Sequence, residues 1–136
     1  MKLSIDCIRD VLMELEALDM GSFGLEYFPN SVKKYGETQV SYTFAKLKEA
    51  RYIMGDVAMD EGGYYHFFQV QCMTYSGHQL LAQIRDEKRW TTVKTILSSV
   101  RDYSLSAITA ASEGVTKAAI DKVLGELDGG EPVIRL

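Results

Sequence analysis

Residues 32–73 decide the fold: VKKYGETQVSYTFAKLKEARYIMGDVAMDEGGYYHFFQVQCM. The pattern predicts a short helix that ends at Gly36 and a second helix over residues 38–50. Apolar residues of the second helix recur at i, i+4 and i+7, a spacing that gathers side chains on one helix face. The apolar face holds Val40, Phe44 and Leu47, and the opposite face holds Gln39, Tyr42, Lys46 and Glu49.

Two strands are expected after this helix, over residues 52–59 and 64–73, joined by the acidic turn 60–63. The second strand alternates in polarity, and its more apolar set is expected to face the core. That set is Phe68, Val70 and Cys72. Helix, turn, helix and hairpin is the element order of a winged helix-turn-helix, which commonly places one helix in a DNA groove. Wings that contact phosphate usually carry Lys or Arg, so the acidic turn argues against that contact.

The segments before this stretch complete a small α+β domain. A first helix is predicted over residues 4–18, with Ser4 as its N-cap. Residues 25–28 have the pattern of a short strand that pairs with the hairpin, which would give a three-stranded antiparallel sheet. Ser31 is the expected cap of the short second helix.

The sequence after the hairpin predicts additional helices. The first is expected to begin at Thr74 or Ser76, and the last at Ser104, with an interruption at Gly114. Between them, another amphipathic helix is marked by its apolar positions, Trp90, Val93, Ile96, Leu97 and Val100. Residues 1–128 are therefore interpreted as one winged-helix-like domain with a C-terminal helical extension over 74–128. Residues 129–136 are expected to form a flexible tail.

Charge is distributed unevenly along the chain. The 136 residues carry a formal net charge of −4, which weighs against a strong nonspecific nucleic-acid binder. Residues 30–51 nevertheless hold five basic and two acidic residues, a local charge of +3, whereas residues 1–29 have a charge of −4. The basic surplus lies on the predicted helix-turn-helix and favours double-stranded DNA as a partner.

Composition also bounds the location and the chemistry. The sequence has neither an apolar run of about 18 residues nor a basic-then-apolar leader, so we expect a cytoplasmic protein without a membrane span. Cys7 and Cys72 are expected to be reduced thiols. His66, Cys72 and His78 have metal-binding side chains, but their spacing matches no zinc pattern. We expect no metal and no cofactor.

Three stretches resemble a known family: MKLSIDCIRDVLMELE (1–16), VSYTFAKLKEARYI (40–53) and TYSGHQLLAQIRDEKRWTTVKT (74–95). The third stretch has the family's pattern, which consists here of Gly77-His78, Ile84-Arg85-Asp86, Trp90 and Val93-Lys94. The chain is similar to domain-of-unknown-function family 2513, whose members are small bacterial and phage-associated proteins. The central helix departs from that family, with Tyr42-Thr43-Phe44 where a Tyr-His-Leu run is common. The resemblance implies a winged-helix-like fold and no particular activity.

The outward face of the 38–50 helix is the candidate DNA site. Gln pairs with adenine and Lys with guanine or phosphate, while nearby basic residues position a protein on the DNA backbone. The groove-facing candidates are Gln39, Ser41, Tyr42, Lys46 and Lys48, and the backbone candidates are Lys33, Lys34 and Arg51. The plainer interpretation is a solvated helix face.

The motif residues that the resemblance selects are interpreted as structural. Arg85 and Asp86 are expected to form charge pairs, Trp90 to pack a helix junction, and His78 to make a structural hydrogen bond. The remaining motif residues are Gly77 and Ile84. No nucleophile or pair of acids converges as catalysis requires, so we do not expect an enzyme.

Two functions fit these observations. The first is a bacterial or prophage DNA-binding regulator that reads DNA with the 38–50 helix. The second is an interaction module that binds a protein or a second copy of itself, which the acidic total and the large helical half suggest. The apolar stripe Trp90, Val93, Leu97 and Val100 fits either a covered core or a homodimer interface.

Overall fold

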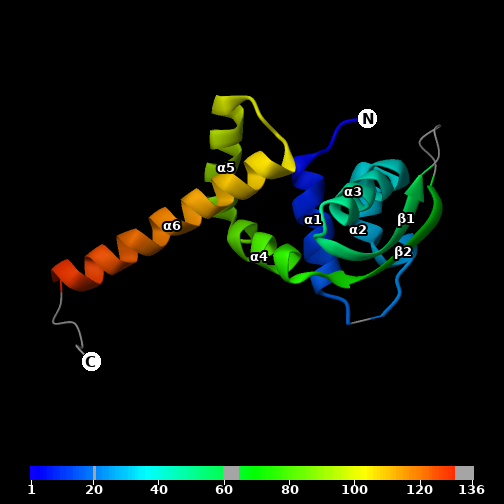
Figure 1. Cartoon of the computed structure of the whole chain (residues 1–136), viewed down its shortest axis with the longest axis horizontal. Helices are drawn as coiled ribbons and strands as arrows, with labels where there is room; N and C mark the ends of the chain where they lie inside the picture. The colour runs from blue at the N-terminus through cyan, green and yellow to red at the C-terminus, as the bar shows by residue number, and fades with distance from the viewer. Residues whose placement is uncertain (20, 60–64, 131–136) are drawn as a thin grey trace. The chain divides into compact units, whose positions relative to one another are not determined.

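The computed structural model describes residues 1–19, 21–59 and 65–130 (Figure 1). Within these residues the fold is a mostly helical α+β arrangement of six α-helices and a two-stranded antiparallel sheet. It divides into two compact units, Met1–Arg85 and Asp86–Leu136. The predicted acidic turn at 60–63 and the tail from residue 131 lie outside the described residues.

Three helices that pack on one another open the first unit. α1 (Ile5–Glu16) begins at the predicted cap, because Ser4 Oγ accepts a hydrogen bond from the backbone N–H of Cys7 at 3.2 Å. α2 (Pro29–Tyr35) leads into α3 (Glu37–Glu49) through Gly36 alone. Gly36 has a φ of +87°, a conformation that favours glycine, so the predicted turn is confirmed.

α2 begins earlier than the sequence suggested. Pro29 occupies the first helical position, where its missing N–H costs nothing. Ser31 therefore lies inside the helix and is buried, and the prediction that it is the N-cap is wrong. The Glu14 carboxylate of α1 takes that role by accepting hydrogen bonds from the backbone N–H groups of Asn30 and Ser31, at 3.3 and 2.6 Å.

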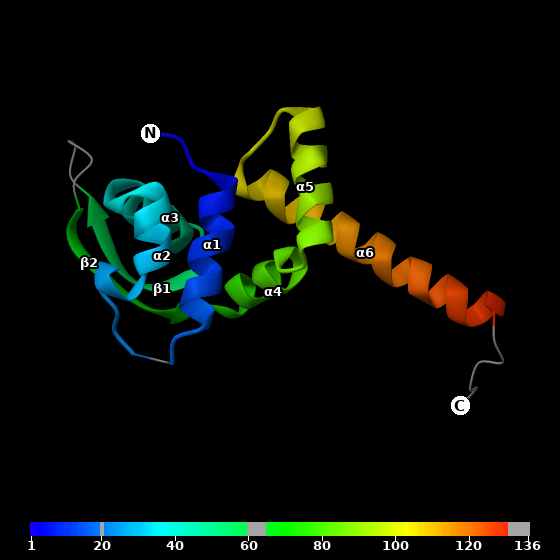
Figure 2. The same cartoon turned by 180° about the vertical axis from the view of Figure 1, so that it is seen from behind.

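β1 (Ile53–Met59) and β2 (Tyr65–Met73) form the predicted hairpin. α3 packs on both strands, and Figure 2 shows α3 beside the hairpin from the reverse side. The predicted strand at 25–28 is wrong, because Leu25–Tyr27 forms a 3-10 helix, η1. Of the described residues before α2, Phe23 alone pairs with β2, through two hydrogen bonds of 2.8 and 2.9 Å to Val70. The chain must turn toward α2 within a few residues, and η1 makes that turn.

A β-bulge reverses the alternation of side chains near the end of β2. Met54 pairs with Cys72 but Gly55 pairs with Val70, so Gln71 is an extra residue in β2. Val70 and Met73 are consequently both buried, whereas Cys72 is only half-buried. Its Sγ lies 3.8 Å from Sδ of Met54, which is 52% exposed. The prediction that Cys72 faces the core fails for this reason.

The predicted core face of the hairpin is right at Phe68 and Val70. The Phe68 ring packs edge-on against Phe44, with ring centroids 5.4 Å apart, and against Phe28 at 6.2 Å. Phe28 and Phe44 are fully buried and lie 4.8 Å apart. This aromatic cluster joins α3 to the sheet and holds the outward face of α3 in place.

α4 (Tyr75–Ile84) begins at Thr74, one of the two predicted caps. Thr74 Oγ1 accepts from the N–H of Gly77 at 3.2 Å and donates to the carbonyl of Arg51 at 2.6 Å. Gly77 lies against the chain just before β1, where an added Cβ would meet the Tyr52 carbonyl oxygen at 2.1 Å. The glycine of the motif is therefore required by a close backbone approach.

The second unit contains α5 (Glu87–Val100) and α6 (Leu105–Gly130), which pack against each other. α6 begins after Ser104, whose Oγ accepts from the N–H of Ala107 at 3.1 Å. The predicted interruption at Gly114 is wrong, since a helix can absorb one glycine at a cost of about 1 kcal/mol. None of the helices in the described part of the chain has both the length and the apolar content that crossing a bilayer requires.

Candidate nucleic-acid interface

α3 and β1 border a hollow of about 390 Å³ in the first unit. Its lining residues are Tyr42, Ala45, Lys46, Lys48, Glu49 and Val57. Tyr42, Ala45, Lys46 and Glu49 recur at i, i+3, i+4 and i+7, so the helical repeat brings them to one face. Three of the predicted DNA-contacting residues, Tyr42, Lys46 and Lys48, therefore share one surface.

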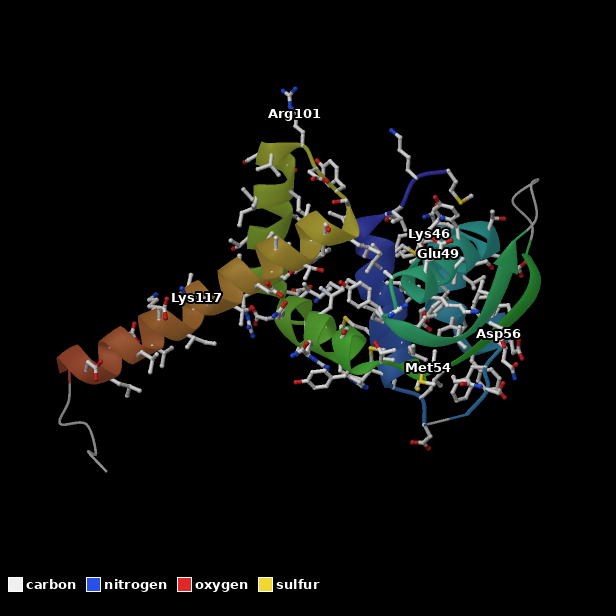
Figure 3. All side chains as sticks on the ribbon, in the orientation of Figure 1. Lys46, Glu49, Met54, Asp56, Arg101 and Lys117 are labelled. Atoms are coloured by element: carbon white, nitrogen blue, oxygen red, sulfur yellow. The ribbon has the colours of Figure 1, made fainter. Side chains whose placement is uncertain are left out.

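Carboxylates pair with both lysines of this hollow. Lys46 Nζ lies 3.1 Å from Oε2 of Glu49, one turn further along α3, and 5.4 Å from the centre of the Tyr42 ring. Lys48 Nζ lies 3.1 Å from Oδ1 of Asp56 on β1; Figure 3 labels Lys46, Glu49 and Asp56. The side chains of both pairs are between 36% and 71% exposed. Exposed pairs contribute roughly 0–1 kcal/mol each, so a competing phosphate can displace the carboxylates.

The basic residues of α2 do not line this hollow, and Lys34 borders a separate one with Asp10 of α1. Lys33 and Lys34 are exposed, and Lys34 Nζ lies 3.1 Å from Oδ2 of Asp10 on α1. The same Asp10 oxygen accepts a 2.6 Å hydrogen bond from the Tyr35 hydroxyl. Burial, and then this hydrogen bond, raise the pKa of Tyr35 far above its usual value. Tyr35 therefore stays protonated and ties α2 to α1.

Two of the groove-facing candidates do not face outward freely. Ser41 is fully buried, because it follows Val40 and precedes Phe44 by three residues, which places it at the edge of the packed face. Its prediction as a DNA contact is corrected accordingly. Gln39 is half-buried, and its Nε2 donates to the carbonyl of Lys2 at 3.1 Å. Arg51 is exposed directly after α3, with a left-handed φ of +65°.

The motif residues of the first unit hold α4 to α1. Ile84 is buried, and its carbonyl accepts from Arg9 Nε at 2.9 Å, while the Arg85 carbonyl accepts from another nitrogen of Arg9 at 2.7 Å. The Arg85 guanidinium forms an ion pair with Glu16 and lowers the pKa of that carboxyl. His78 is exposed and lines a smaller hollow of about 290 Å³.

The motif residues of the second unit belong to α5. Asp86 is the N-cap, since its carboxylate accepts from the N–H of Arg89 at 2.9 Å. A capping role replaces the predicted charge pair. Trp90 is 4% exposed, and Lys94 Nζ lies 6.0 Å from the centre of its ring.

His78 and the two thiols do not line the hollow between α3 and β1. Within them, no three His, Cys, Asp or Glu side chains gather as metal ligands would. The side chain of His66 lies outside the described part of the chain. Cys7 and Cys72 are free thiols, and burial raises the pKa of Cys7 to about 11. A thiol with that pKa is a weak nucleophile at neutral pH.

Sequence reasoning placed Glu49 on the outward face but did not predict the carboxylates that pair with the lysines. Glu49 was recognisable, because it follows Lys46 by three residues on a helix. Asp10 and Asp56 come from α1 and β1 and approach the lysines only when the chain folds. The sequence carried no local signal for either of them.

The first unit thus defines a small helix-rich α+β protein in which a helix, a glycine turn, a second helix and a hairpin follow one another. The chain belongs to the family described as "Hypothetical protein (DUF2513)", whose model matches residues 2–102, and the predicted family is confirmed. The chain is also similar to an uncharacterized protein of Haemophilus influenzae (strain ATCC 51907 / DSM 11121 / KW20 / Rd). The two are 30% identical over 117 residues, which cover 85% of this chain and 95% of that protein. No solved structure matches the chain.

Proposed function

We propose that this chain is a winged-helix protein that binds double-stranded DNA, with α3 as the helix that enters the major groove. The order α2, α3, β1 and β2 supports the winged-helix assignment. The bridge between Phe23 and Val70 lies where a third strand of such a sheet would pair. The hairpin is then the wing, and Gly36 makes the turn between the two helices.

The observation that carries the proposal is the shared surface of Tyr42, Lys46 and Lys48 on α3. Tyr42 and Lys46 are half-buried, with the Lys46 ammonium over the Tyr42 ring, and Lys48 is exposed. Lys33, in the last turn of α2, and Arg51, just after α3, are also exposed. Cations in these positions are suited to phosphate contacts that hold a recognition helix in register.

The paired carboxylates set the strength of this binding. DNA phosphates must displace Glu49 from Lys46 and Asp56 from Lys48, and both carboxylates also repel the DNA backbone. We therefore expect weak nonspecific binding with a steep dependence on salt. Glu49→Gln and Asp56→Asn should each increase the affinity for DNA, whereas a surface that does not contact DNA would show no change.

Fluorescence anisotropy with mixed genomic duplex DNA tests the proposal, first at about 50 mM and then at about 200 mM salt, between which several phosphate contacts cost orders of magnitude in affinity. Lys46→Glu should weaken binding and leave the circular dichroism spectrum unchanged. Lys122→Glu is the matched control, since Lys122 is an exposed helical lysine of α6 on the side away from its apolar stripe. Absence of binding at low salt, or equal effects of the two variants, would contradict the proposal.

A second candidate function uses the same surface to bind a protein. The alternation of Lys46, Glu49, Lys48 and Asp56 favours it, because mixed charge is typical of a polar protein interface more than of a DNA-binding face. Glu49→Gln then distinguishes the two functions: it weakens binding to a protein with complementary charges and strengthens binding to DNA. A partner retained in pull-down at high salt would also support the second function.

A further inference from the structure

The C-terminal half of α6 has an apolar stripe that the described chain leaves exposed. Its side chains are 51–54% exposed: Ile120, Val123, Leu124 and Leu127. They recur at i, i+3, i+4 and i+7, so they form one helix face. The N-terminal half of α6 instead buries Ile108 and Ser112. Single exposed apolar residues are ordinary, but a contiguous apolar face is typical of an interaction site.

The apolar stripe of α5, which the sequence suggested for either the core or a dimer, is mostly buried within the chain. Trp90, Val93 and Leu97 of α5 are at most 4% exposed, so they are covered within the chain. Only Val100 of that stripe is available, at 62% exposure. On α5, Ile96 is 38% exposed as well, so the larger set of exposed apolar side chains in the described part of the second unit is the one on α6.

We propose that the segment 116–128 of α6 pairs in antiparallel orientation with the same segment of a second copy of this chain. Two of the charges beside the stripe, those of Lys117 and Asp128, support this orientation, whereas Asp121 on the same side would lie near its own copy. Lys117 and Asp128 are both exposed and stand eleven residues apart, about three helical turns, so they flank the stripe on the same side. In an antiparallel pair each side of the stripe meets itself. Lys117 then lies level with Asp128 of the second copy, and the pair forms twice.

A parallel pair does not use these charges. Each residue would then be level with its own copy, which leaves Lys117 and Asp128 about 16 Å apart along the axis. In the antiparallel register the twofold axis passes close to Val123. Ile120 of one helix packs between Leu124 and Leu127 of the other, which buries the whole stripe.

The size of the stripe sets the strength of the association. Stable dimers commonly bury about 800 Å² per partner, which is more than four half-exposed side chains can supply. We therefore expect a reversible, concentration-dependent dimer. This inference uses residues of the second unit and does not depend on the proposed DNA binding.

Sedimentation velocity of the full chain over a range of concentrations measures this association. Val123→Glu should raise the dimer dissociation constant by about tenfold or more, because it removes two buried side chains and places two like charges near the axis. Ala118→Glu is the matched control, since Ala118 is exposed on the opposite side of α6. A wild-type chain that stays monomeric, or equal dissociation constants for the two variants, would overturn the proposal.

Disulfide cross-linking tests the orientation. In a Cys72→Ser background, Leu124→Cys should form a disulfide between the two copies on mild oxidation. Residue 124 lies near the twofold axis, so residue 124 of one helix is close to residue 124 of the other. Leu127→Cys, at an exposed position of the stripe, should not, because the two copies of residue 127 lie about 14 Å apart along the antiparallel pair. Cross-linking of both variants would indicate a parallel pair and overturn the antiparallel arrangement, and cross-linking of neither would overturn the interface.

Discussion

Replacing Gly77 with alanine tests how α4 begins against the backbone before β1. The new Cβ would lie 2.1 Å from the Tyr52 carbonyl oxygen and 3.2 Å from Cβ of Met73. Tyr52 cannot simply move away, because its carbonyl accepts a 3.0 Å hydrogen bond from the N–H of Thr74. The clash therefore has to displace α4 or break the contact at its first turn.

The expected loss of stability follows from three contributions. Overpacking costs about 1–3 kcal/mol, and disturbing the Thr74 cap costs about 1 kcal/mol. Alanine recovers about 1 kcal/mol over glycine in a helix interior. The net result is a destabilisation of roughly 1–3 kcal/mol, since the recovered propensity offsets the disturbed cap.

Gly114→Ala in α6 is the matched control, because a Cβ added at Gly114 would meet no described atom within 4 Å apart from its chain neighbours and the nearby backbone of its own helix. The same substitution should stabilise α6 by up to about 1 kcal/mol there. Hydrogen exchange of backbone amides measures each unit separately, and urea unfolding followed by circular dichroism measures the whole chain. Unchanged or slower exchange in α4 and β1 of Gly77→Ala would refute the reasoning.

Three more predictions concern the first unit. Phe44→Ala should lower the free energy of unfolding by about 3–5 kcal/mol, because Phe44 is fully buried between Phe28 and Phe68. Thermal unfolding measures this, and a melting temperature lowered by only a degree or two would contradict it. Cys72 should react with a thiol reagent at pH 8 much faster than Cys7, whose pKa burial raises to about 11; equal rates would be inconsistent with it. Arg85→Gln should lower the unfolding free energy by at most about 1 kcal/mol near neutral pH. Arg85 lowers the pKa of Glu16, so its contribution is present above the unfolded pKa of about 4.3 and is lost as the pH falls through the folded value. A difference that persists unchanged at pH 2 would show that the ion pair is not its source.

Local patterns in the sequence predicted most of the elements. Ser4, Thr74 and Ser104 each cap a helix, because a hydroxyl followed by an apolar helical repeat is a local signal. The core face of α3 was equally readable from the spacing of Val40 and Phe44. These features depend only on neighbours along the chain.

The errors occur where segments distant in sequence meet. A strict alternation cannot reveal the bulge at Gln71, which turns Met73 inward and leaves Cys72 half-buried. Ser31 resembled a cap only because Glu14, which satisfies the start of α2, comes from another helix. Ser41 looked free because a serine beside the apolar face is polar, yet its place between helices buries it.

The same limit applies to the charge of the candidate DNA site, and it bears on the choice between the two functions. The sequence count over residues 30–51 gives a surplus of +3. Folding brings in two more carboxylates, Asp10 beside Lys34 and Asp56 beside Lys48, so residues 30–51 together with these two have a surplus of only +1. A surface so nearly neutral does not attract DNA over long distances. Binding by α3 must then come from short-range contacts that replace these ion pairs, which is why the effect of removing a single carboxylate is more informative than the total charge.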